Sequence, residues 1–171
     1  MKHTISVLVE NKFGVLARIS GLFSARGFNI SSLAVGETDD PSVSRMTIVV
    51  EGDDRTLDQI KKQLNKLIDV IKVVDYKEGS FLDRELILIK VSVTAKTRKE
   101  VLEAVESSGA GIASAGSASI SIEASGDQAK IKALIELLRP FGILEVVRTG
   151  RIAMDTGDKA LKAEGKPEVN E

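Results

Sequence analysis

Asn11, Gly14 and Asn29 are the residues whose types and spacing best suit ligand chemistry. Gly14 stands where a helix pattern begins, and the first N–H groups of a helix lack intrahelical acceptors and attract an anion. Glycine permits close approach of a carboxylate to the backbone, and the Asn11 amide offers both a donor and an acceptor. Asn29, just after the helix, could supply the same chemistry from a neighbouring copy. The pattern suits a zwitterion. The alternative is that both asparagines are turn residues and Gly14 only relieves steric crowding.

The rest of the sequence offers little for catalysis. The single histidine, His3, stands at the chain start without the rigid partners that a general base needs, and cysteine is absent. No HExxH motif or repeated metal-ligand spacing occurs. Turn and helix-cap chemistry explains the acidic pairs Asp39-Asp40 and Asp53-Asp54. We therefore expect no catalytic residue and no metal site in this chain.

Composition narrows the class of partner. Lys plus Arg number 24 and Asp plus Glu 25, and the chain has one Tyr and no Trp. This balance, without a basic patch or aromatic residues for base stacking, disfavours nucleic acid as a partner. No run approaches the ~20 apolar residues of a membrane span, and the first apolar run is too short and too alternating for a signal peptide. We expect a cytoplasmic protein.

The same order of strand and helix patterns occurs twice along the chain. Alternating apolar residues predict strands, and apolar residues three and four apart predict helices. The first copy has strand patterns at 4–10, 29–36, 44–51 and 70–74 and helix patterns at 15–23 and 57–67. The second has strand patterns at 85–93, 112–124 (two strands, broken near Gly116) and 143–147, and helix patterns at 97–106 and 131–138. This repetition predicts an α+β fold of two tandem ferredoxin-like βαββαβ modules.

We expect a first module at residues 1–77, a linker at 78–84, a second module at 85–154 and a flexible tail at 155–171, where periodicity is lost. A module of this kind carries helices on one face of its sheet only. Domains of about 80 residues bury little more than about 60% of the surface that the unfolded chain exposes, so pairing with a second copy is the usual remedy. We expect a homodimer through the first module.

At these residues the chain resembles the regulatory small subunits of acetolactate synthase, also called acetohydroxyacid synthase. The resemblance extends to about Met154. It is carried by Ser6-Val-Leu-Val-Glu-Asn11, Gly14-Val-Leu, Gly21-Leu-Phe, Arg26-Gly-Phe-Asn-Ile30, Ser44-Arg-Met-Thr-Ile48, Lys62-Gln-Leu-Asn-Lys-Leu-Ile-Asp-Val70, Arg84-Glu-Leu and Arg148-Thr-Gly150. Two stretches depart from the family pattern: Phe13 stands where proline is common, and Ser107–Ala115 replaces a Phe-Arg pair and a hydrophobic strand.

The resemblance implies an N-terminal ACT domain that dimerises and binds a branched-chain amino acid, usually valine, followed by a C-terminal ferredoxin-like domain. It implies effector contacts from Asn11, Gly14 and Val15 of one protomer and from Asn29 and Ile30 of the other. The subunit would have no catalysis and no cofactor of its own. It would activate a separate catalytic large subunit, which is expected to use thiamine diphosphate, Mg and FAD, and would make that subunit sensitive to feedback inhibition by valine in branched-chain amino acid biosynthesis.

Two alternatives remain at this stage. A stand-alone tandem-ACT amino-acid sensor that acts on another enzyme or regulator would have the same pocket. Ferredoxin-like folds also include acylphosphatase-type hydrolases, but these need a phosphate-cradling loop with an arginine, and the loop from Glu10 to Gly14 offers only Lys12. Co-purification of a large thiamine-dependent subunit would distinguish a small subunit from a stand-alone sensor. Turnover of an acyl phosphate by the isolated chain would support the hydrolase.

Overall fold

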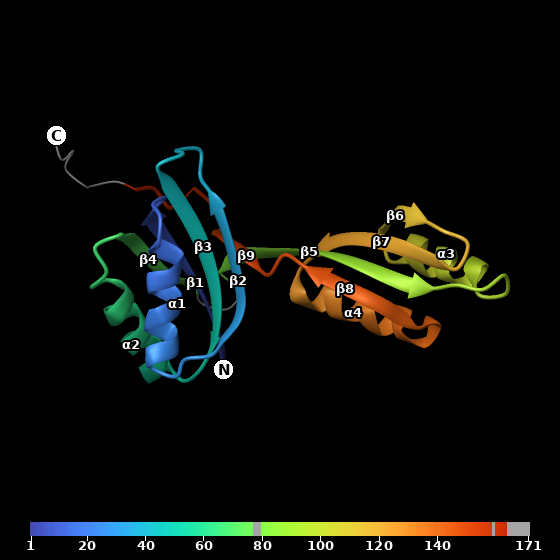
Figure 1. Ribbon diagram of the computed structural model, residues 1–171, viewed down its shortest axis with the longest axis horizontal. Coiled ribbons are helices and arrows are strands. Elements are labelled where there is room, and N and C mark those ends of the chain that lie inside the picture. Colours follow the sequence, from blue (N-terminus) through green and yellow to red (C-terminus); the bar gives the residue numbers. More distant parts are fainter. Residues whose placement is uncertain (77–79, 159, 164–171) are drawn as a thin grey trace. The chain divides into compact units, whose positions relative to one another are not determined.

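The computed structural model describes residues 1–76, 80–158 and 160–163. The chain divides into two units, one formed by Met1–Leu82 with the chain from Arg151 onward and the other by Asp83–Gly150 (Figure 1). Each unit combines an antiparallel sheet with two α-helices, which confirms the predicted α+β class and the two ferredoxin-like modules.

The first unit follows the predicted order. Its elements are β1 (Lys2–Glu10), α1 (Val15–Ala25), β2 (Ile30–Glu37), β3 (Val43–Glu51), α2 (Asp54–Leu64) and β4 (Val70–Tyr76). The strands lie in the order β2-β3-β1-β4, so the hairpin partner β2 forms one edge of this sheet. Strand β1 pairs with β3 in a register that places Val7 opposite Met46 and Ile5 opposite Ile48.

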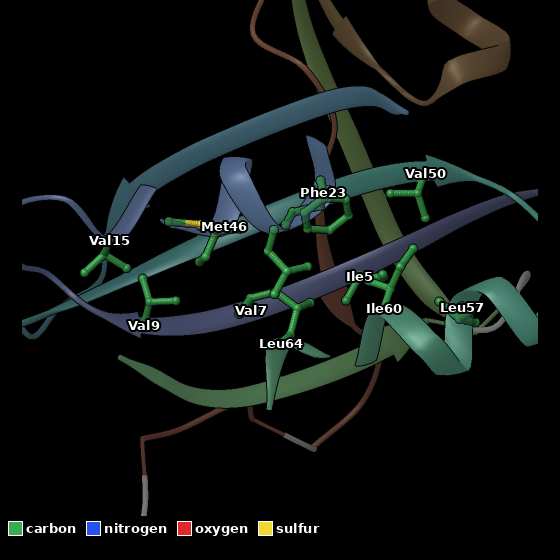
Figure 2. Close-up of a cluster of buried hydrophobic side chains, with 13 residues drawn as sticks. Ile5, Val7, Val9, Val15, Phe23, Met46, Val50, Leu57, Ile60 and Leu64 are labelled. Carbon is green, nitrogen blue, oxygen red and sulfur yellow. The ribbon is translucent and has the colours of Figure 1, made fainter. Parts of the chain in front are cut away.

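The core of the first unit lies between the sheet and its helices (Figure 2). Alternate residues of β1 and β3 face α1 and α2, because successive side chains of a strand point to opposite faces. The side chains that share this core include Ile5, Val7, Val9, Met46, Ile48 and Val50 from the strands and Ile19, Phe23, Ile60 and Leu64 from the helices. Full burial of such a side chain stabilises the fold by about 1.5–3 kcal/mol.

The second unit repeats the arrangement. Its elements are β5 (Phe81–Ser92), α3 (Arg98–Ser107), β6 (Gly111–Ala115), β7 (Ser119–Gly126), α4 (Gln128–Leu138), the short 3₁₀ helix η1 (Arg139–Phe141) and β8 (Ile143–Arg148). The strand order is β6-β7-β5-β8. Ile87, Ile89 and Val91 of β5 are fully buried in its core, and the side chains between them are exposed. The long strand β5 is therefore a two-faced central strand with one face packed on the helices.

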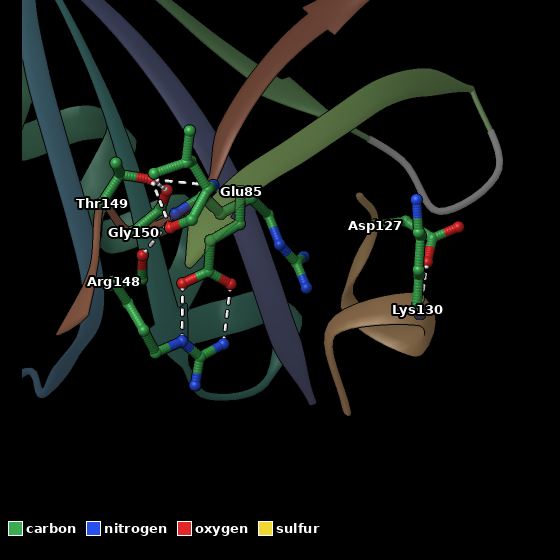
Figure 3. Close-up of polar contacts among 9 residues, drawn as sticks. Glu85, Asp127, Lys130, Arg148, Thr149 and Gly150 are labelled. Atoms are coloured by element: carbon green, nitrogen blue, oxygen red, sulfur yellow. Dashed lines mark hydrogen bonds and ion pairs between the residues drawn. The ribbon is translucent and has the colours of Figure 1, made fainter. Parts of the chain in front are cut away.

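Two of the sequence segments that carry the family resemblance, Arg84-Glu-Leu and Arg148-Thr-Gly150, contact each other in the second unit (Figure 3). Arg148 donates from Nε and Nη2 to the two carboxylate oxygens of Glu85, both at 2.7 Å. The Leu86 N–H donates to the Thr149 hydroxyl at 3.1 Å, and the Thr149 N–H donates to the Leu86 carbonyl at 3.1 Å. Hydrogen bonding to Glu85 raises the pKa of Arg148 above its ordinary value. These hydrogen bonds connect the end of β8 and the residue that follows it to β5.

The unit boundaries differ from the expected domain boundaries. Strand β5 begins at Phe81, inside the expected linker 78–84, of which 78 and 79 lie outside the described residues. Strand β9 (Ile152–Asp155), which no sequence pattern predicted, pairs with β5, and the chain from Arg151 groups with the first unit. Strand β9 has 4 residues, of which only Ala153 is buried. Its sequence therefore shows too little alternation of apolar and polar residues to predict a strand. The expected tail, 155–171, begins inside β9, and residues 159 and 164–171 lie outside the description.

Candidate ligand-binding site

Helix α1 begins without a side-chain cap. Gly14 occupies the N-cap in the left-handed region, with φ 83°; among the described residues the helix has no side-chain cap hydrogen bond, and its first turn lacks acidic residues. By contrast, α2 and α4 are capped by Asp53 and Asp127, which accept from Thr56 N at 2.7 Å and Lys130 N at 2.8 Å (Figure 3 shows the second). The N-terminus of α1 therefore presents N–H groups and a positive dipole end with no acid of its own.

Gly14 is half-buried at this site, and Val15 is buried. A Cβ built on Gly14 meets no heavy atom within 4 Å, so its positive φ, rather than crowding, explains the glycine. The Val15 side chain is 3% exposed and lies in the core near Val9 and Met46 (Figure 2). The Val15 N–H donates to the Lys12 carbonyl at 3.4 Å, so Val15 contributes mainly to the core beneath this site. Phe13, just before, is fully exposed.

Asn11 is held more firmly than the sequence suggests. Its Nδ2 donates to Glu37 Oε1 and to the Pro41 carbonyl, both at 2.9 Å, and its N–H donates to the Ser42 carbonyl at 2.7 Å. Both amide hydrogens are therefore engaged within the chain, and Oδ1 is the atom left to accept from a ligand. The sequence suggested that this amide could both donate to and accept from a zwitterion. In the structure its donor group is already used, so Asn11 can only accept from a ligand.

Asn29 and Ile30 lie at the far end of α1. Asn29 is exposed, and its side chain makes no hydrogen bond within residues 1–76, 80–158 and 160–163. Ile30 opens β2, and its partly buried side chain packs against the core. Helix α1 has 11 residues, a length of about 16 Å at the usual rise. One chain therefore brings Asn11, Gly14 and Val15 together but keeps Asn29 and Ile30 apart from them.

The loop between β2 and β3 contributes residues that the sequence analysis did not select. Glu37 ends β2 and accepts the hydrogen bond from Asn11, so the carboxyl end of the edge strand lies beside Asn11. Asp40 accepts from the N–H and the hydroxyl of Ser42, and these bonds lower the pKa of Asp40. Asp40 is thus a turn residue, as predicted. No sequence signal marks Glu37, because its role depends on a contact 26 positions away.

Two further features are absent from the described part of the chain. No group of three or more His, Asp or Glu side chains there is placed to hold a metal ion. No helix among those residues is both long and apolar enough to cross a membrane.

Known protein families match both units. A model of the AHAS small subunit-like ACT domain matches residues 5–72, and a model of the small subunit of acetolactate synthase matches residues 84–157. The probable acetolactate synthase small subunit of Archaeoglobus fulgidus is 53% identical over 159 residues, which covers 93% of this chain and 99% of that protein. The acetolactate synthase small subunit of Mycolicibacterium smegmatis is 50% identical over 161 residues, or 94% and 95% of the two chains.

A solved structure gives the same result for the fold. The crystal structure of the acetolactate synthase small subunit from Thermotoga maritima is 38% identical in sequence and superposes with a TM-score of 0.86. The match covers 93% of this chain and 99% of that one.

Proposed function

The chain belongs to the family of acetolactate synthase small subunits, and on that premise we propose that it binds valine between the ACT domains of two copies. The chain is a regulatory and not a catalytic subunit. In this proposal it activates a catalytic large subunit and makes that subunit sensitive to valine. Residues 1–77 carry effector binding and dimerisation, and the complex acts in the cytoplasm in branched-chain amino acid biosynthesis.

The hydrogen bond between Asn11 and Glu37 is the observation that carries the proposal. It places Asn11 at the carboxyl end of β2, an edge strand of the first sheet. An edge strand offers unpaired N–H and C=O groups to a second copy. A two-fold axis through β2 would pair the two edge strands antiparallel, so the start of one would lie against the end of the other. The partner's Asn29 and Ile30 would then approach Asn11.

This arrangement fits a zwitterion with an apolar side chain. The ligand carboxylate would accept from the N–H group of Gly14 and would lie beside Val15 at the start of α1, where the helix dipole favours negative charge. Asn11 Oδ1 would accept from the ammonium group, and the free amide of the partner's Asn29 would close the site. Val35 of β2 is 45% exposed on the same edge and offers apolar surface to the ligand side chain. A branched-chain amino acid satisfies all of these groups.

Inhibition would follow from a shift between two arrangements of the dimer. Valine can shift that equilibrium only by its differential affinity for the two, and a coupling of about 1 to 3 kcal/mol is ordinary for allosteric proteins. The large subunit would respond to the arrangement that valine favours by losing activity. The chemistry of that subunit, which joins two pyruvate molecules or pyruvate and 2-oxobutyrate, requires its own thiamine diphosphate, Mg and FAD.

Calorimetric titration with L-valine, leucine, isoleucine and alanine tests the proposal. We expect valine to saturate near one ligand per chain. Asn29→Ala should weaken valine binding at least tenfold, while Asn65→Ala, an exposed asparagine of the same unit, should leave it unchanged. Equal affinity for alanine and valine, or full affinity in Asn29→Ala, would contradict the assigned seam.

A further inference from the structure

The face of the first sheet opposite its helices is buried, although a two-layer module would expose it. Thr4, Ser6 and Thr47 lie on that face and are 3%, 0% and 3% exposed. Burial this complete requires a layer that keeps water from the face, and hydroxyls under such a layer need hydrogen-bond partners within the protein. In the first unit the cover comes from the chain that follows Gly150.

Arg45 joins this cover to the sheet. Its guanidinium donates from Nε to Ser6 Oγ at 3.3 Å and from Nη2 to the Tyr76 hydroxyl at 2.7 Å and the Ala153 carbonyl at 2.6 Å. Ala153 belongs to β9 and is only 5% exposed. One arginine thus links β1, β3, β4 and β9.

Arg151 makes the second attachment. Its backbone N–H donates to Ser32 Oγ at 2.9 Å, and its side chain donates to Thr4 Oγ1 at 3.2 Å. The chain after Gly150 is therefore tied to β1, β2 and β3 by side chains that the helices do not use.

Further along, residues 160–163 reach the β2–β3 loop. They line a hollow of about 670 Å³ together with Leu8, Val43, Arg45 and residues 37–40 of the loop. Leu161 is half-buried there, and Leu8 and Val43 form an apolar surface. Lys162 lines the same hollow as three acidic residues, Glu37, Asp39 and Asp40, so residues of opposite charge share this hollow.

The same loop fixes Asn11. Glu37 and Pro41 accept from the Asn11 amide, and the Ser42 carbonyl accepts from the Asn11 N–H. We propose that residues 160–163 act as an internal positioning element: they hold the loop of residues 37–42, and the loop holds Asn11 in its ligand-accepting orientation. Their effect on the ligand rests on the proposed function, whereas their effect on the loop does not.

Two truncations separate this element from the rest of the chain. A chain ending at Asp158 keeps β9 and the contacts of Arg45 and Arg151 but removes residues 160–163. A chain ending at Ala163 is the matched control. Hydrogen exchange of the Asn11 and Thr38 amides, which donate to the Ser42 and Val43 carbonyls, reports on the loop without any ligand. Titration with L-valine reports on the site.

We expect the chain ending at Asp158 to exchange both amides at least fivefold faster and to bind valine at least fivefold more weakly, with the control equal to the full chain. If the chain ending at Asp158 exchanges both amides at the rate of the full chain, the proposal is overturned, whatever its affinity for valine. Faster exchange with unchanged valine affinity would also overturn it, because Asn11 would then be positioned independently. If the full chain fails to bind valine, the proposed function fails, and the ligand part of this inference fails with it.

A charge reversal in the full-length chain guards against a truncation that disturbs folding. Lys162→Glu places a fourth carboxylate on the hollow and should accelerate exchange of the same amides. Lys96→Glu makes the same charge change at an exposed position of the second unit and should not. Equal exchange in both variants would contradict the proposed contact between residues 160–163 and the loop.

Discussion

Substituting alanine for Gly14 or Gly27 separates the backbone role of a glycine from a ligand-binding role. Both residues flank α1, with φ 83° and 67°, and a Cβ added at either meets nothing within 4 Å. Alanine at either position therefore costs only the left-handed conformation, about 1–2 kcal/mol of the free energy of unfolding. Only Gly14 lies at the proposed carboxylate site. The two variants should be equally destabilised, and Gly14→Ala alone should lose valine affinity.

Urea unfolding of the full chain gives the first quantity, and calorimetric titration with L-valine under conditions where both variants remain folded gives the second. A methyl group beside the helix N-terminus hinders the approach of the carboxylate, so we expect at least a tenfold loss of affinity in Gly14→Ala. Matching affinities in the two variants would refute the placement of the carboxylate. A large loss of stability in one variant only would refute the conformational argument.

The remaining predictions concern stability. Gly21→Ala lies inside α1 with open space around its Cβ, so thermal or urea unfolding should show a gain of about 0.5–1 kcal/mol. Arg148→Met leaves the carboxylate of Glu85 buried without its two charged hydrogen bonds and should cost about 2 kcal/mol in the same assay, while Arg84→Met, an exposed neighbour, should cost far less. Hydrogen bonds to Thr56 lower the pKa of Asp53 from 3.8, so the stability given by this cap is present above that pH and lost as pH falls through the lower folded value. The difference in melting temperature between wild type and Asp53→Ala should therefore shrink between pH 5 and pH 2, and a constant difference would contradict the cap assignment.

Local sequence patterns were sufficient to predict most of the fold. Alternation in residues 4–10 predicted β1, and the spacing from Val15 to Phe23 predicted α1, because one face of each element packs on a shared core. Helix-cap chemistry was expected of Asp53, and it caps α2 in the structure. These features depend on neighbours within a few positions, so a single sequence contains them.

Contacts between distant residues were not predictable in the same way. Strand β9 has four residues, and its place is fixed by hydrogen bonds such as that from Arg45, 108 positions away. The partners of Asn11 lie in the β2–β3 loop, which sequence analysis identified only as a turn. The types of Asn11, Gly14 and Asn29 indicated ligand chemistry, and the helix pattern between them already suggested that Asn29 acts from a second copy. In the structure α1 does separate Asn29 from the other two residues, so the proposed site needs a second copy.

The most direct test of the central claim is the activity of an acetolactate synthase catalytic subunit mixed with this chain, measured with and without L-valine. We predict that the wild-type chain raises the activity of the catalytic subunit and that valine reverses the gain. A chain carrying Asn29→Ala should still activate but should lose the response to valine. Activation that valine never reduces, or full valine inhibition in Asn29→Ala, would contradict a regulatory site at the seam between two ACT domains.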